Sequence, residues 1–105
     1  MPAGPGPLEV RVVARGRTPV IALSGELDIA TAEAVRHAVA PLLHDADELV
    51  VDATELVFAD ATGLSALLGP AHELKARNGR LVIRNPTRIV RRVLDLLDLD
   101  DFAIE

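Results

Sequence analysis

Few residue types in this sequence could carry out chemistry, and their spacing does not bring them together. Cysteine is absent, which excludes a thiolate nucleophile, a thiolate metal site and a disulfide scaffold. His37 and His44 are seven positions apart, too far to share a metal ion, and no His-Glu-x-x-His spacing occurs. The serines, Ser24 and Ser65, do not lie in a Gly-x-Ser-x-Gly turn, and no glycine-rich phosphate-binding loop is present. We therefore expect no enzyme, no metal site and no cofactor.

Two clusters of like charge near the C-terminus have simpler explanations than a site. The aspartates lack the alternating spacing and closing Glu of a calcium loop, so we expect a solvated helix end. The arginines fit one side of a helix, which is either a solvated face or a docking patch for an acidic partner. The aspartates are Asp95, Asp98, Asp100 and Asp101, and the arginines are Arg84, Arg88, Arg91 and Arg92.

The segment from Asp60 to Leu64 is the most informative in the chain. It joins a loop to the start of a helix, where free backbone N–H groups and the helix dipole attract an anion. The competing interpretation is purely structural: Asp60 caps the helix, and Gly63 lets the helix pack closely on a sheet. Asp60 would itself repel a bound phosphate, so we do not expect nucleotide binding there.

Composition limits the class of protein. Half of the 105 residues are hydrophobic, which excludes a disordered chain and suits one domain. The net charge of −5, and an aromatic content of only Phe58 and Phe102, argue against nucleic-acid binding. No signal peptide is visible, and the longest uncharged run, residues 61–71, is too short to cross a membrane. We expect a cytoplasmic domain over residues 8–105 with a Pro/Gly-rich flexible leader, residues 1–7, and no membrane insertion.

The hydrophobic periodicity alternates between strands and helices. Strands are expected over residues 8–15 and 20–23, which are joined as a hairpin, and over residues 49–51 and 80–84. Leu99 and residues 102–104 are expected to make a short last strand. Helices are expected over three stretches. The first begins after Thr31 as N-cap, with Ile29 on its apolar stripe and Pro41 bending or ending it.

The second helix runs from Asp60 or Ala61 to Asn78-Gly79, with a bend at Gly69-Pro70. The third begins at Asn85-Pro86 and has an apolar face of Ile89, Val90, Val93, Leu94 and Leu97. The order is β-β-α-β-α-β-α-β. It predicts an α/β fold: a small single domain with a mixed, mostly parallel sheet and right-handed crossovers.

Three segments, in this order, carry a family resemblance. They are Gly25–Asp28 (Gly-Glu-Leu-Asp) after the second strand, Leu49–Asp52 at the third strand, and Phe58–Leu64 (Phe-Ala-Asp-Ala-Thr-Gly-Leu) at the helix start. Together they resemble the STAS domains, which comprise the bacterial anti-sigma-factor antagonists and a related domain of sulphate transporters. The resemblance spans Leu8 to Ile104. The chain ends soon afterwards, so a further C-terminal helix of many relatives is expected to be missing or shortened.

The resemblance implies a non-enzymatic binding switch. In the antagonist family, the unphosphorylated domain binds a kinase-type anti-sigma factor and thereby frees the sigma factor. The kinase then phosphorylates the serine after the aspartate, and the added charge of about −1.5 to −2 opposes binding.

In this chain the residue after Asp60 is Ala61, which has no hydroxyl. Thr62 is rotated by about 100° along a helix and is either a cap or a substitute phosphate acceptor. The resemblance therefore predicts a module that stays unphosphorylated at the usual position. The expected partner-binding residues are Glu26, Asp28, Asp60, Ala61, Thr62, Gly63, Leu64, Leu67 and Leu68.

Three other functions remain open at this stage. The chain could be the STAS subunit of a lipid-transport ABC complex or part of a stressosome-like scaffold. A phosphoaspartate receiver is a less favoured alternative, because it needs an acidic pair and a lysine after a late strand. The single lysine, Lys75, is expected on a helix.

Overall fold

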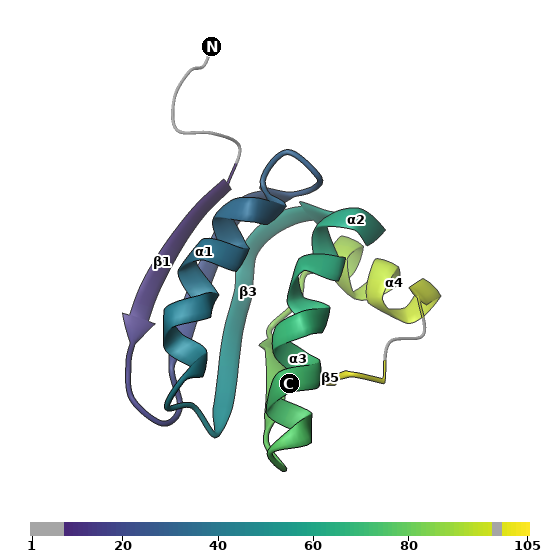
Figure 1. Ribbon diagram of the computed structural model, residues 1–105. Coiled ribbons are helices and arrows are strands. Elements are labelled where there is room, and N and C mark those ends of the chain that lie inside the picture. Colours follow the sequence, from purple (N-terminus) through teal and green to yellow (C-terminus); the bar gives the residue numbers. More distant parts are fainter. Residues whose placement is uncertain (1–7, 98–99) are drawn as a thin grey trace.

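The computed structural model describes residues 8–97 and 100–105 (Figure 1). The expected leader, residues 1–7, and Leu99 lie outside the described residues. Five strands form one sheet in the order β1-β2-β3-β4-β5, in which β1 is antiparallel to β2 and the other neighbours are parallel. The strands are β1 (Leu8–Ala14), β2 (Val20–Leu27), β3 (Glu48–Ala59), β4 (Arg80–Arg84) and β5 (Phe102–Ile104).

The helical elements connect successive parallel strands. They are α1 (Ala32–Leu43), α2 (Ala61–Leu64), the 3-10 turn η1 (Ser65–Leu67), α3 (Leu68–Ala76) and α4 (Arg88–Leu97). Because each strand is followed by its neighbour in the sheet, right-handed crossovers place the helices on one face. Figure 1 shows α1 and α3 lying across the same side of the sheet. The predicted mixed, mostly parallel α/β fold is confirmed.

The main core lies between that sheet face and the helices. It contains residues from every strand except the half-buried edge strand β1, and α1, α3 and α4 each add apolar side chains. Along β1, Leu8, Val10 and Val12 pack against this core while Glu9 and Arg11 are exposed, as the alternation predicts.

The middle helix is not the single bent helix expected. The break falls at η1, four residues before the expected bend at Gly69-Pro70. Pro70 is tolerated as the third residue of α3, because backbone N–H groups in a first helical turn have no partner within the helix. Pro41 lies inside the last turn of α1, which continues for two more residues and ends at Leu43.

Of two expectations about the start of α1, the one for Ile29 is wrong and the one for Thr31 as N-cap residue is confirmed. Ile29 precedes the helix and is 76% exposed, so it is not part of the buried stripe. Thr31 occupies the N-cap position, but its side chain makes no cap hydrogen bond. Its hydroxyl donates instead to the Glu26 carbonyl oxygen at 2.9 Å and accepts from the Asp28 N–H at 3.0 Å.

The start of α4 also differs from the prediction. Asn85 has a φ of 54°, and the helix begins only at Arg88, so Asn85 is not its cap and Pro86 is not its first residue. Thr87 takes the capping role, since its hydroxyl accepts from the Val90 N–H at 3.4 Å. Ile89 is 54% exposed rather than part of the buried face.

Strands β2 and β3 are longer than their apolar runs indicate. They continue in parallel pairing to Leu27 and Ala59, which places Glu26 beside Phe58 and Leu27 beside Ala59. Both strands therefore end at the same edge of the sheet. The loop that leads to α1 and the start of α2 leave from this edge.

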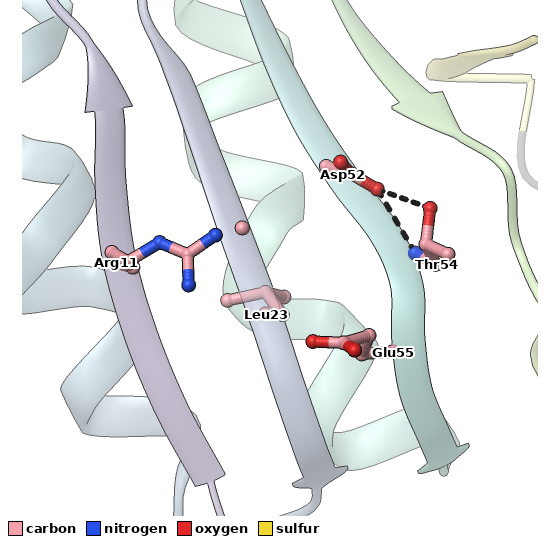
Figure 2. A pocket seen from close by; sticks show the side chains of 6 residues that line it. Arg11, Leu23, Asp52, Thr54 and Glu55 are labelled. Atoms are coloured by element: carbon pink, nitrogen blue, oxygen red, sulfur yellow. Dashed lines mark hydrogen bonds between the residues drawn. The ribbon is translucent and has the colours of Figure 1, made fainter.

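The register of β2 and β3 shifts where Asp52 and Thr54 lie, since Ala22 pairs with Asp52 but Ser24 pairs with Glu55. The Asp52 carboxylate accepts hydrogen bonds from the Thr54 N–H at 3.0 Å and from its hydroxyl at 2.6 Å (Figure 2). These bonds, which favour the charged carboxylate, lower the pKa of Asp52.

Candidate functional site

Asp60 joins the end of β3 to α2 and holds the helix start. Its backbone is extended, with φ −117° and ψ 177°, and its carboxylate accepts from the Gly63 N–H at 2.7 Å. Its own N–H donates to the Leu27 carbonyl oxygen at 3.2 Å, and its carbonyl oxygen accepts from the Leu64 N–H at 2.9 Å. The capping interpretation of the sequence is therefore the one that the structure shows.

Gly63 brings α2 into direct contact with the end of β2. A Cβ atom at this position would overlap the Leu27 carbonyl oxygen and lie 2.7 Å from the Asp28 nitrogen. No side chain larger than hydrogen fits without moving one of the two backbone segments. The prediction that glycine permits close packing is thus correct, and its contact is the backbone at Leu27–Asp28.

The loop after β2 is held by its own polar groups. The Asp28 carboxylate accepts from the Ala30 N–H at 2.9 Å, and the Asp28 carbonyl oxygen accepts from the Ala32 N–H at 2.9 Å. The buried Thr31 hydroxyl links the loop to Glu26. This loop and α2 form a fixed pair of elements at one edge of the sheet, so the surface they present is preorganised.

The structure brings the expected partner-binding residues together but places them at different depths. Glu26, Ala61 and Thr62 are exposed, and Asp28, Asp60 and Leu68 are half-buried. Gly63, Leu64 and Leu67 are buried, and the two leucines belong to the core cluster. In this structure the three residues therefore lie beneath the surface, and the two leucine side chains support it from the core.

Two apolar side chains at this edge were not among the expected contact residues. Ile29 lies in the loop after Asp28, and Phe58, 40% exposed, is paired in register with Glu26. The hydrophobic periodicity predicts Ile29 on a helix stripe, and no sequence pattern singles out the Phe58 side chain as a contact. A large apolar residue beside a Gly-Glu-Leu-Asp turn is the signal that could have identified Ile29.

We define the contact surface by seven residues at this edge: Glu26, Asp28, Ile29, Phe58, Asp60, Ala61 and Thr62. Its three charged residues are all acidic. Among the described residues, no salt bridge involves Glu26, Asp28 or Asp60. The Gly63 N–H already bonds the Asp60 carboxylate, and α2 has four residues. This helix start therefore does not have the open array of N–H groups that a phosphate needs.

The histidines and the lysine lie at separate positions in the described parts of the chain. No group of three or more potential metal ligands is found there. His37 lies 3.6 Å from Glu33, which also pairs with Arg36, and His72 lies 3.0 Å from Asp101. Lys75 is exposed in the last turn of α3 and does not follow a strand, unlike the lysine of a receiver domain.

The arginine group is divided between two elements. Arg84 is the last residue of β4 and lies 3.8 Å from Asp52, whereas Arg91 pairs with Asp95 at 3.4 Å on α4. Only Arg88, Arg91 and Arg92 share α4, where all three are exposed.

A shallow polar hollow lies on the sheet face opposite the helices. Arg11, Asp52, Thr54 and Glu55 line it together with Ala22 and Leu23 (Figure 2). In this region the Arg11 and Arg84 guanidinium groups help to lower the pKa of Asp52, after the hydrogen bonds from Thr54. Among the residues that line this hollow, the Asp52 carboxylate accepts hydrogen bonds from Thr54 and lies 3.8 Å from the Arg84 guanidinium.

A family model described as "Mlab, STAS domain" matches residues 10–105, and the chain belongs to the STAS family. Among named relatives, it is 29% identical over 90 residues to an anti-sigma F factor antagonist of Lysinibacillus sphaericus, covering 84% of this chain and 77% of the relative. The predicted resemblance to antagonists is confirmed.

Solved structures agree with this assignment. The unphosphorylated anti-sigma factor antagonist SpoIIAA is 29% identical, with a TM-score of 0.75 over 93% of this chain and 87% of SpoIIAA. An anti-sigma factor antagonist from Mycobacterium paratuberculosis is 25% identical, with a TM-score of 0.82 over 97% of this chain and 88% of the other. Within the described parts of the chain, no helix combines the length and apolarity that a membrane crossing requires.

Proposed function

We propose that the chain is a regulatory protein-binding module of the cytoplasm that docks on a kinase-type anti-sigma factor through the contact surface. The observation that carries this proposal is that the β2–α1 loop and α2 are held against each other by backbone contacts and hydrogen bonds. Gly63 packs against the backbone at Leu27–Asp28, and Asp60 caps the helix start. Partner recognition benefits from such a rigid surface, because little ordering entropy is lost on docking.

The composition of the surface suits a protein partner. Ile29 and Phe58 supply exposed apolar side chains, and Glu26, Asp28 and Asp60 supply carboxylates at the same ends of β2 and β3. Large apolar anchors within a polar rim are typical of protein–protein contacts. The partner that fits would present an apolar recess bordered by lysine or arginine.

Ala61 occupies the position that the antagonist motif gives to the phosphorylated serine, and it is exposed. A side chain without a hydroxyl cannot accept a phosphoryl group. The module therefore stays competent for docking at this position while relatives with serine are switched off. Thr62 is exposed next to it and remains a candidate substitute acceptor.

Calorimetric titration with a kinase-type anti-sigma factor tests the proposal. The Ala61→Asp variant places a charge at the centre of the surface and is expected to weaken binding at least about ten-fold, because like charges and desolvation oppose docking. Ala76→Asp is the matched control, since Ala76 is an exposed alanine at the far end of α3. Equal binding by both variants, or no binding by the unmodified chain, would overturn the proposal.

A second candidate is the STAS subunit of a lipid-transport ABC complex or of a stressosome-like scaffold. The matched family model is described by the name Mlab rather than by an antagonist's name, which favours keeping this candidate. Affinity purification of the tagged chain from its native cell distinguishes the two. An ABC-type ATPase and permease would support transport, whereas an ATPase-fold kinase would support signalling.

A further inference from the structure

Ser65 is an exposed hydroxyl one helical turn beyond Ala61. It follows α2 directly and opens η1. Positions four apart on a helix share a face, so Ser65 lies on the side of the helix start where the missing acceptor would have been. The Ser65 hydroxyl donates to the Thr62 carbonyl oxygen at 2.6 Å within the same turn.

Three of the chain's threonine hydroxyls are engaged elsewhere in the fold. Thr31 is buried and donates to Glu26, Thr54 donates to Asp52 at 2.6 Å, and Thr87 donates to the Leu56 carbonyl oxygen at 3.0 Å. Each of these bonds ties one element to another or fixes a strand irregularity. The Ser65 bond spans only three residues, so releasing it disturbs no distant contact.

Ser65 also borders a hollow of about 340 Å³ between α1 and α3. Arg36 lines the same hollow from α1, and Glu73 lines it from α3. The remaining lining residues are small or apolar: Ala40, Leu43, Ala66, Gly69 and Pro70. The hollow thus has room beside Ser65 and a guanidinium group in its wall.

The Arg36 guanidinium is available to an anion. Its partner is Glu33, 3.1 Å away on the same helix, and both side chains are about half exposed or more. Such exposed pairs contribute little free energy. A phosphate dianion, which forms stronger charge-assisted hydrogen bonds with a guanidinium, would compete effectively for Arg36.

We propose that Ser65 is the phosphate acceptor that replaces the lost serine at position 61, with Arg36 stabilising the phosphoserine. This inference rests on the proposed function, because the kinase and its ATP come from the partner. The Ser65 Oγ forms a bond to the γ-phosphorus of ATP. The bond from that phosphorus to the bridging oxygen breaks, ADP leaves, and the hydroxyl proton passes to a base of the kinase.

The modification would change the helix start in two ways. The phosphoserine loses the proton donated to Thr62, and its charge is repelled by that carbonyl oxygen, so it turns toward Arg36. It also places about −1.5 to −2 charge beside a surface that is already acidic. Phosphorylation at Ser65 is therefore expected to weaken partner binding at least about ten-fold.

The test incubates the full chain with the kinase-type anti-sigma factor, ATP and Mg²⁺, and maps phosphate by tandem mass spectrometry. Wild type, Ser65→Ala, Thr62→Val and Ala61→Ser are compared. We expect phosphate on Ser65 in wild type and Thr62→Val, and none in Ser65→Ala. Ala61→Ser restores the usual acceptor and serves as the control for kinase activity.

The outcomes separate this inference from the proposed function. Phosphate on Thr62 alone, or on Ala61→Ser but not on wild type, overturns the Ser65 assignment and leaves the docking function intact. If the partner does not bind the unmodified chain, both proposals fail.

A phosphorus NMR titration gives a readout that depends on Arg36. In phosphorylated wild type, the guanidinium should lower the pKa of the phosphoserine relative to phosphorylated Arg36→Gln. Identical phosphate pKa values in the two proteins would contradict the role of Arg36.

Discussion

Gly63 touches the backbone of Leu27, and this contact holds the start of α2 against the end of β2. The carbonyl oxygen of Leu27 lies too close to the Cβ position of residue 63 for any side chain to fit, and the same oxygen accepts a hydrogen bond from the Asp60 N–H. One carbonyl group therefore serves both the close approach and the positioning of the cap. The geometry of the contact surface depends on this point.

Gly63→Ala is expected to lower the free energy of unfolding by about 1–3 kcal/mol, because one backbone segment must move to admit the methyl group. Urea unfolding followed by circular dichroism measures the loss. Gly69→Ala is the control, since a Cβ there meets nothing within 4 Å. In a helix this control should be neutral or stabilising by up to about 1 kcal/mol. Equal stability of the two variants would contradict the tight contact.

Asp60→Ala removes the side-chain acceptor for the Gly63 N–H. We expect a loss of about 0.5–2 kcal/mol in the free energy of unfolding, as for other N-caps. Asp60→Asn keeps an acceptor oxygen and should lose much less. Thermal unfolding of both variants checks the prediction, which requires the alanine variant to be the less stable one.

Ile29→Ser should weaken binding of the anti-sigma factor without lowering stability. Ile29 is exposed, so its replacement leaves no cavity, but it removes an apolar anchor from the contact surface. Calorimetric titration should show a loss of at least about 1 kcal/mol in binding free energy. Val13→Ser, on the edge strand β1, changes another exposed aliphatic residue and should bind normally. A similar loss for both variants would show that Ile29 is no specific anchor.

The stability of the protein should fall with acidification partly through Asp52. The pKa of its carboxyl is lowered from its ordinary 3.8 in the folded state, chiefly by hydrogen bonds from Thr54. The stabilisation is present above the unfolded-state pKa and is lost as the pH falls through the lower, folded-state value. Urea unfolding between neutral pH and acid should show a smaller loss for Asp52→Asn than for wild type. An identical pH dependence would exclude this contribution.

The alternation of apolar runs with helical periodicity predicts the order of strands and helices along the chain and the α/β class. It does so because each element must bury one side, and this requirement sets the spacing of its apolar residues. Helix ends were less predictable. The cap of α4 is Thr87 rather than Asn85, since the Thr87 hydroxyl also bonds the Leu56 carbonyl oxygen, a contact 31 positions away along the chain. Sequence spacing alone does not reveal such a contact.

At the candidate site, too, some features follow from the sequence and others only from the tertiary structure. The residue types at Asp60, Ala61 and Gly63 by themselves determine a capped helix start, a close approach and the absence of the usual hydroxyl, because these are properties of single side chains. The helical spacing of Leu64 and Leu67 also predicts their burial, whereas only the tertiary structure decides that Ile29 and Phe58 are exposed. Exposure depends on what the rest of the chain packs against, and here the parallel pairing of β2 with β3 and the break at η1 set that packing.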